Sequence, residues 1–109
     1  MAPLLQVFQS LADPTRLAIV ERLRRGPATL TEVGEPLGMT LPAVLKHVRV
    51  LEASGLVEGT RTGRTRHLRL RAKPMRAAMD YLATYRVFWE SRLDSLGDYL
   101  DRQDQDKKE

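Results

Sequence analysis

Basic side chains are concentrated in one stretch of this 109-residue sequence, between residues 61 and 76. No aspartate or glutamate occurs between Glu58 and Asp80, whereas this interval holds Arg61, Arg64, Arg66, Arg69, Arg71, Lys73 and Arg76. Guanidinium groups bind phosphates through paired, charge-assisted hydrogen bonds, and each phosphate that they neutralise releases condensed counterions. The chemistry that this stretch indicates is the binding of a polyanion, with an affinity that falls as the salt concentration rises.

The charge of the whole chain points the same way. The net charge is +4, and it is unevenly spread. Residues 1–79 hold 13 Lys or Arg against 6 Asp or Glu, whereas residues 80–109 hold 5 against 8. A basic body with an acidic end is typical of a protein whose main partner is polyanionic. Charge alone does not identify that partner as nucleic acid.

Residues that could support catalysis or hold a metal are scarce. The sequence has no cysteine, which excludes disulfides, thiolate metal sites and thiol redox switching. Neither a nucleophilic serine beside a histidine and a carboxylate nor a phosphate-binding glycine loop is present. For His47 and His67, contacts with phosphate, solvent or neighbouring residues are favoured over metal binding. We therefore expect a protein that is not an enzyme and that has no cofactor and no metal site.

The first half of the sequence carries helix signals. Apolar residues recur at helical spacing at Leu4, Leu5, Val7, Phe8 and Leu11. This pattern predicts an amphipathic first helix that ends at Ala12. A second helix begins with Asp13 as its N-cap and Pro14 at its first position, and runs through Arg25 to a stop at Gly26-Pro27.

Two more helices follow, joined by a tight turn at residues 38–40. Thr29 or Thr31 is the predicted N-cap of a short third helix that ends at about Leu37, and Pro36 predicts a distortion within it. Thr40 begins a fourth helix, which Gly55 closes. Its predicted core stripe consists of Val44, Val48 and Leu51.

From Leu56 the apolar period changes to two. Alternation in residues 56–61 and 66–70, around a turn at 62–65, predicts a two-stranded hairpin. A long helix is predicted after Pro74, with apolar residues spaced four and three apart: Met75, Met79, Leu82, Trp89, Leu93, Leu96 and Leu100. Such a stripe, although Arg86 interrupts it, favours a partner helix. Residues 102–109 are expected to form a charged, disordered tail, which leaves residues 1–101 as one domain.

The order of these elements predicts a mainly α winged helix-turn-helix, with five helices and a two-stranded β-hairpin as the wing. In this fold the fourth helix enters the major groove of DNA, and the wing reaches the backbone or the minor groove. The basic residues described above lie on the predicted wing and just after it. The expected partner is therefore double-stranded DNA.

Three blocks of sequence, LADPTRLAIVERL, GMTLPAVLKHVRVLEASGLV and GRTRHLRL, resemble the ArsR/SmtB family of bacterial repressors. The resemblance covers roughly residues 5–100. It implies a homodimeric repressor of its own or a neighbouring operon, joined through the first and last helices, which leaves its operator when an effector binds. The implied DNA-facing residues are Thr40, Leu41, Pro42, Leu45, Lys46, His47, Arg49, Arg61, Arg64, Thr65 and Arg66. The expected dimer contacts are Leu4, Leu5, Phe8, Met79, Leu82, Trp89, Leu93 and Leu96.

The sequence departs from the family at the reading surface and at the metal sites. Leu41 and Leu45 stand where the family often has Gln or Ser, so contacts with thymine methyl groups would replace some hydrogen-bonded base readout. Metal-sensing members carry cysteines in the third helix, where this chain has Gly34 and Pro36, and Asp and His ligands on the last helix, where it has no histidine. A member without the usual metal sites is expected, and any effector is an unknown small molecule.

The sequence is also compatible with two other functions. The first is a sequence-tolerant architectural DNA-binding protein, and the second is a protein interaction module that has lost DNA binding. No apolar run approaches the roughly 20 residues of a membrane span, and the first ten residues show no export signal. We therefore expect no membrane partner and a location in the bacterial cytoplasm, with nucleoid association when DNA is bound.

Overall fold

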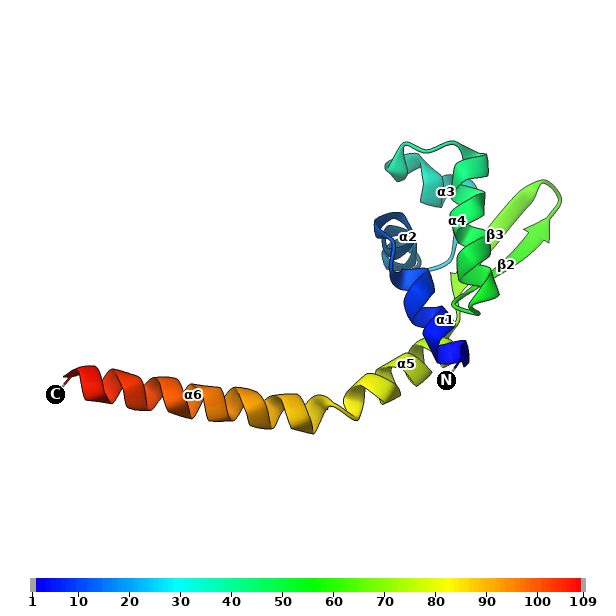
Figure 1. The fold of residues 1–109 in the computed structure, drawn as a ribbon. Helices are drawn as coiled ribbons and strands as arrows, with labels where there is room; N and C mark the ends of the chain where they lie inside the picture. The colour runs from blue at the N-terminus through cyan, green and yellow to red at the C-terminus, as the bar shows by residue number, and fades with distance from the viewer. Residues whose placement is uncertain (1, 109) are drawn as a thin grey trace. The chain divides into compact units, whose positions relative to one another are not determined.

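The computed structural model describes residues 2–108, and the side chains of residues 3–105. The chain forms two compact units, one up to Ala78 and one from Met79 onward (Figure 1). The elements are, in chain order, α1 (Ala2–Leu11), α2 (Pro14–Arg24), β1 (Ala28–Thr29), α3 (Leu30–Gly34), the 3₁₀ turn η1 (Glu35–Leu37), α4 (Leu41–Ala53), β2 (Val57–Thr62), β3 (Thr65–Leu70), α5 (Ala72–Ala83) and α6 (Arg86–Lys108).

The junction between α1 and α2 is held by Asp13 and Arg16. Asp13 is the N-cap of α2, and its carboxylate accepts a hydrogen bond from the backbone N–H of Arg16 at 3.0 Å. The Arg16 guanidinium donates to the carbonyl oxygens of Ser10, at 2.6 Å, and Gln9, at 3.2 Å. Carbonyls in the last turn of a helix have no intrahelical partner, so Arg16 closes the end of α1. The predicted start of α2 is confirmed.

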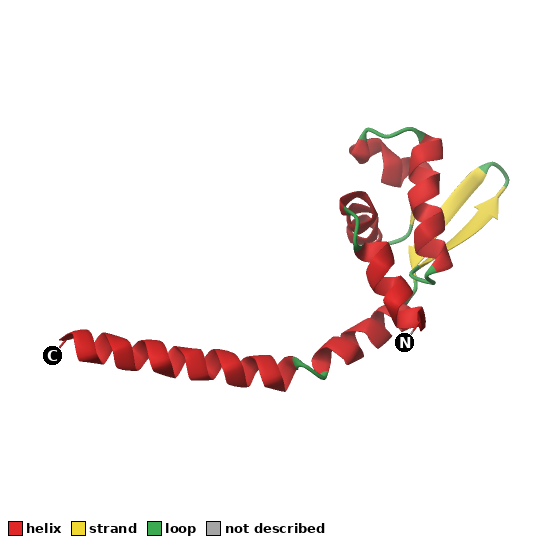
Figure 2. Ribbon diagram, viewed as in Figure 1, coloured by secondary structure: helices red, strands yellow, loops and turns green. Residues whose placement is uncertain are grey.

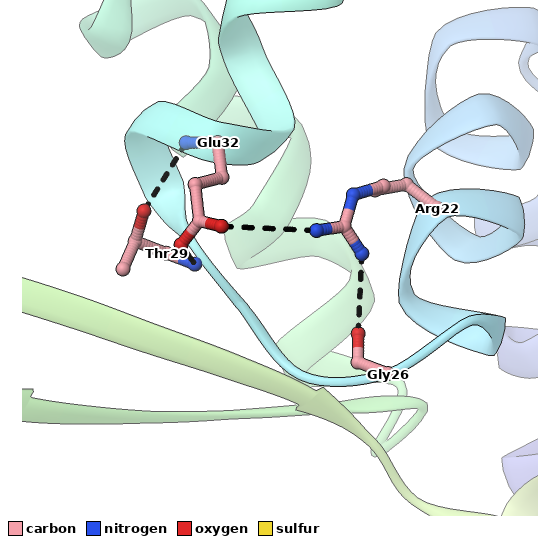
Figure 3. A network of polar contacts seen from close by, with 4 residues as sticks. All are labelled: Arg22, Gly26, Thr29 and Glu32. Atoms are coloured by element: carbon pink, nitrogen blue, oxygen red, sulfur yellow. Dashed lines mark hydrogen bonds and ion pairs between the residues drawn. The ribbon is translucent and has the colours of Figure 1, made fainter.

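A capping box fixes the start of α3 (Figure 3). The Thr29 hydroxyl accepts from the backbone N–H of Glu32, and the Glu32 carboxylate accepts from the backbone N–H of Thr29, both at 3.1 Å. Thr29, rather than Thr31, is therefore the N-cap. Pro36 lies in η1, whose 3₁₀ geometry is the form that the predicted distortion takes, and Gly38 ends it with φ +64°.

The fourth helix, α4, begins and ends within one residue of the predicted positions. The Thr40 hydroxyl accepts from the backbone N–H of Ala43 at 3.4 Å. At the other end Gly55 has φ +81°, and the backbone N–H of Leu56 donates to the carbonyl of Leu51 at 3.1 Å, as in a Schellman motif. The predicted core stripe is confirmed, because Val44, Val48 and Leu51 are all 0% exposed.

The sheet has three antiparallel strands in the order β1-β3-β2, one more than the predicted hairpin. The hairpin itself is confirmed, with Thr62 opposite Thr65 and Val57 opposite Leu70. Gly63, with φ +62°, is the first residue of its two-residue turn, a position that favours glycine in type II′ turns. The additional strand, β1, pairs with β3 through two residues only. A strand of this length shows no periodicity, so the alternation pattern could not predict it.

One hydrophobic core joins α1 to α4, the sheet and the start of α5 in the first unit. Its buried apolar residues are Val7, Ile19, Val20, Leu23, Ala28, Val33, Val44, Val48, Leu51, Leu56, Val57, Leu68 and Ala78. Strand β2 packs beside α4 and β3 packs beside α2, and the hairpin continues to an exposed tip (Figure 2). The core therefore fixes α4 and the base of the hairpin together.

The long last helix of the prediction is divided into α5 and α6. The Thr84 hydroxyl donates to the carbonyl of Tyr81 at 2.7 Å, and the backbone N–H groups of Thr84 and Tyr85 form i→i−3 bonds. These contacts compete with helical hydrogen bonds and explain the break. The described residues thus form six α-helices, not five. Residues 102–108 were expected to be disordered, but they continue α6 without a break after residue 101.

None of the helices in the described part of the chain combines the length and the apolar character that a bilayer span requires.

Candidate nucleic-acid interface

One face of α4 is exposed and basic. Pro42, Lys46 and Arg49 recur at helical spacing and are exposed, on the side of α4 opposite the buried core stripe. The start of the helix adds Leu41, which is 46% exposed, and Thr40, whose hydroxyl is used as the N-cap. The first two turns of α4 therefore present cations and small apolar groups to solvent.

The two flanks of this face have different neighbours. Leu41, half-buried Leu45 and Glu52 share the flank toward the wing, where Glu52 contacts Arg66. His47 lies on the other flank, and its Nδ1 atom is 3.8 Å from Oδ2 of Asp13. His47 is therefore only partly directed to solvent, although the resemblance placed it among the DNA-facing residues.

The tip of the hairpin is exposed and basic. Arg61, Arg64 and Thr65 are all exposed. The Arg61 Nε atom donates to the carbonyl of Gly63 at 3.1 Å, which orients this side chain along the turn. Within the described residues, the Arg64 guanidinium makes no hydrogen bond or ion pair. Arg64 is thus the wing cation most available to an external phosphate.

Two other hairpin arginines are neutralised within the protein. Arg66 donates from Nη2 to both carboxylate oxygens of Glu52, at 2.7 and 2.9 Å. Arg69 binds Glu58 on the neighbouring strand, with Nε 2.8 Å from Oε2. The sequence predicted Arg66 as a DNA-facing residue but did not predict its ion pair. Sequence distance hides this contact, since Glu52 and Arg66 are 14 residues apart.

A cleft of about 310 Å³ lies between the wing tip and the start of the two helices of the helix-turn-helix. Its lining residues come from β1, α3, α4 and the wing: Thr29, Leu30, Thr31, Leu41, Arg64, Thr65 and Arg66. The hydroxyls of Thr31 and Thr65 and the guanidinium of Arg64 are groups that donate to phosphate oxygens. Sequence reasoning missed Thr31, because only the short strand β1 brings the start of α3 beside the hairpin.

The acidic residue of the capping box is held ionised. Hydrogen bonds from the backbone and the hydroxyl of Thr29, together with the nearby Arg22 cation, lower the pKa of Glu32 below its ordinary value. Arg22 Nη2 lies 3.8 Å from Glu32 Oε2, and its Nη1 donates to the carbonyl of Gly26 at 3.4 Å (Figure 3). This network ties α2 to the start of α3.

The predicted dimer residues differ in their surroundings. Leu4 and Phe8 are half-buried and pack against the core of the first unit, whereas Leu5 is exposed. On α5 and α6 the apolar stripe is exposed by 52–64% at Met79, Leu82, Trp89, Leu93 and Leu96. The structure therefore leaves this stripe without a cover in the described part of the chain.

No group of three or more His, Asp or Glu side chains able to hold a metal ion occurs among the described residues. At the positions of the family's third-helix cysteines, Gly34 packs against Val44 and Pro36 lies in η1.

These elements define the class of protein. Helices α3 and α4, joined by a tight turn and followed by a basic hairpin that packs beside α4, form a winged helix-turn-helix.

Comparisons with known proteins support this class. A helix-turn-helix domain model matches residues 11–60. The transcriptional regulator NmtR of Mycobacterium tuberculosis is 44% identical over 64 residues, which cover 59% of this chain and 53% of that protein. The crystal structure of an ArsR family transcriptional regulator is 42% identical, with a TM-score of 0.75, over 83% of this chain and 93% of that chain.

A third similar protein has been solved as a dimer. The solution structure of a homodimeric winged helix-turn-helix DNA-binding domain from Mycobacterium bovis, a possible ArsR-family regulator, is 25% identical. Its TM-score is 0.64, over 79% of this chain and 82% of that chain.

The chain belongs to the ArsR family of transcriptional regulators. The predicted family and winged helix-turn-helix class are confirmed. The chain spans about half the length of the curated relatives that it matches first.

Proposed function

We propose that this protein is a sequence-specific DNA-binding transcriptional regulator, acting as a homodimeric repressor of its own or a neighbouring operon in the bacterial cytoplasm. One observation carries the proposal. The exposed basic face of α4 and the guanidinium of Arg64 lie on a helix and a hairpin whose base packs in the same hydrophobic core, so both can contact one duplex.

Each part of this surface has its own role in binding. Lys46 and Arg49 supply polar contacts from α4 in the major groove, and Leu41 packs against thymine methyl groups. Arg61 and Arg64 bind backbone phosphates, and the cleft beside Thr31 accepts one of them. Base contacts determine the sequence preference, whereas the wing supplies most of the salt-dependent affinity.

Dimerisation completes the reading surface. Two recognition helices contact half-sites that lie one DNA turn apart, roughly 34 Å, only when two chains associate. The exposed stripe of α5 and α6, together with Leu5 on α1, is the proposed contact between copies. The homodimeric state of the similar domain from Mycobacterium bovis supports this assignment.

The proposed effector is a small organic molecule rather than a metal ion. Glycine and proline side chains provide no metal ligand, and the sequence lacks cysteine. Zinc and softer metals therefore lack their preferred donors at the position of Gly34 and Pro36.

A sequence-tolerant architectural DNA-binding protein is the second candidate. The apolar character of Leu41 and Leu45 favours it, because neither side chain can donate or accept a hydrogen bond at a base edge.

Footprinting on the DNA upstream of the gene tests the proposal. The full chain should protect a site made of two half-sites, and Lys46→Ala and Arg64→Ala should each weaken protection at the same protein concentration. Arg24→Ala is the matched control, because it removes one exposed cation that is paired with Glu21 on α2. Uniform protection of the whole fragment would favour the architectural candidate, and no protection by the folded wild type would overturn both.

A further inference from the structure

Glu52 and Arg66 form the one ion pair between α4 and the wing in the described part of the chain. Arg66 Nη2 lies 2.7 and 2.9 Å from the two carboxylate oxygens, and the side chains of Arg66 and Glu52 are only 30% and 24% exposed. The ion pair is therefore partly shielded from water. Water and salt screen it less than they screen a fully exposed surface pair.

The hairpin makes room for this contact at Gly59. A Cβ atom at position 59 would lie 3.2 Å from both Arg66 Nε and Glu52 Oε1, closer than side chains normally approach. The Arg66 side chain thus passes over β2 at Gly59, which has no side chain to block it. Its Nε atom is buried there and has no hydrogen-bond partner among the described residues. A buried donor without a partner is costly, so an arginine in this place must be held by a compensating contact.

The position of the pair along α4 separates it from the base-reading turn. Glu52 is 11 residues beyond Leu41, which at 1.5 Å per residue is about 16 Å along the helix axis. On β3, Arg66 points to the same face of the sheet as buried Leu68 and lies two residues nearer the tip. Arg64 lies two residues further still toward the tip. The pair therefore links the closing end of α4 to the point where the hairpin leaves the core.

We propose that the Glu52–Arg66 pair is a positioning contact that sets the angle between the wing and α4, so that Arg64 reaches a phosphate while α4 lies in the groove. This inference rests on the proposed function. Arg66 lies two residue steps, about 7 Å, from Arg64, so a bend of about 10° at Arg66 would move the tip by about 1 Å. A displacement of that size breaks a hydrogen bond to phosphate.

If the pair positions the wing, neutralising Glu52 should weaken DNA binding, which is the opposite of the usual electrostatic effect. Neutralising an acidic group beside a DNA-binding surface normally strengthens binding, because it raises the net charge. Glu52→Gln is instead expected to weaken binding to the upstream DNA about five- to tenfold, the scale of losing a phosphate contact. Glu52→Asp, which keeps the charge but shortens the side chain, is expected to weaken it as well.

Glu58→Gln is the matched control. It removes the same charge as Glu52→Gln, but from strand β2 rather than from α4, and Glu58 pairs with Arg69 within the sheet. Its affinity for DNA should be unchanged or higher. Arg64→Ala should weaken wild type and Glu58→Gln equally, but should have little further effect in Glu52→Gln, whose wing is already displaced. Melting curves must show that each variant is folded at the assay temperature.

Backbone dynamics test the contact without DNA. The ¹H–¹⁵N NOE of Gly63 and Arg64 should fall in free Glu52→Gln and stay at the wild-type value in Glu58→Gln. Unchanged NOE values, or tighter DNA binding by Glu52→Gln, would overturn the positioning role. If the NOE values fall as expected but the wild type shows no sequence preference, the proposed function fails and the positioning contact stands.

Discussion

The Nδ1 atom of His47, on the recognition helix α4, lies 3.8 Å from the carboxylate of Asp13, the N-cap of α2. The Asp13 side chain therefore makes two contacts, one within α2 and one with α4. The Asp13 carboxylate accepts a hydrogen bond from the backbone N–H of Arg16, one of the free amides at the start of α2. It also faces His47 on α4, the helix proposed to read DNA. The start of α2 and the orientation of α4 are linked through this carboxylate.

The first prediction concerns Asp13→Asn, because asparagine caps helices as well as aspartate does but carries no charge. The hydrogen bond from the Arg16 backbone, followed by the charges of Arg16 and His47, lowers the pKa of Asp13 below its ordinary value of 3.8. A lowered pKa in the folded state gives stability that is complete above the unfolded pKa and is lost as the pH falls through the folded pKa.

Thermal melting of wild type and Asp13→Asn at a series of pH values measures this effect. The variant should melt a few degrees lower at pH 7, and the difference should shrink as the pH falls below the ordinary carboxyl pKa of 3.8. An offset that stays constant across the whole series would show that the carboxylate charge contributes nothing.

The second prediction concerns the contact between α3 and α4. A Cβ atom on Gly34 would lie 3.0 Å from Val44 Cγ2, so Gly34→Ala must push the two helices apart. We expect a loss of about 1–2 kcal/mol in the free energy of unfolding, as for other overpacked cores, and weaker DNA binding. Urea unfolding gives the first quantity.

Gly97→Ala is the control for this substitution. Apart from the neighbouring backbone of α6, no atom of the described residues lies within 4 Å of a Cβ at Gly97, and alanine favours helix over glycine by about 1 kcal/mol. Gly97→Ala should therefore stabilise α6 or leave the melting temperature unchanged. Equal effects of the two substitutions would contradict close packing at Gly34.

The third prediction tests the capping box at the start of α3. Thr29→Ala removes the hydroxyl that accepts from the Glu32 backbone N–H and should cost about 1 kcal/mol of stability. Thr29→Ser keeps an equivalent acceptor and should remain close to the wild type. Denaturant midpoints of the three proteins compare these effects, and a serine variant as unstable as the alanine variant would place the cause elsewhere, for example in the pairing of β1 with β3.

The fourth prediction concerns association of two chains. Leu93→Asp places a charge in the exposed apolar stripe of α6 and should convert a dimer to a monomer at micromolar concentration. Ser91→Asp adds the same charge on the opposite face of the helix and should leave the dimer intact. Sedimentation equilibrium distinguishes the two results. A wild type that sediments as a monomer would contradict the proposed dimer.

Local signals in the sequence were sufficient for most of the fold. Caps such as Asp13 and Thr40, the glycines after α2, η1 and α4 and the change of period at Leu56 predicted the helices and the hairpin in their correct order. These features act through neighbouring residues, so their spacing is visible in the chain. The break at Thr84 was missed, because it depends on a side-chain hydroxyl bond and not on proline or glycine.

The candidate site was less predictable. The exposed positions of Lys46, Arg49 and Arg64 followed from helical and strand spacing. The pairing of Arg66 with Glu52 did not, because it depends on the tertiary packing of the hairpin against α4. The sequence therefore identified which residues are basic, but the structure was needed to separate available cations from those already neutralised.

Specific recognition of DNA is the central claim, and a competition titration by fluorescence anisotropy tests it most directly. The full chain is titrated, at a fixed salt concentration, against a labelled duplex from its upstream region and against a shuffled duplex of equal length and composition. We predict a preference for the upstream duplex of about 10³-fold or more, as in other specific DNA-binding proteins. Equal affinity for the two duplexes would contradict specific recognition of DNA.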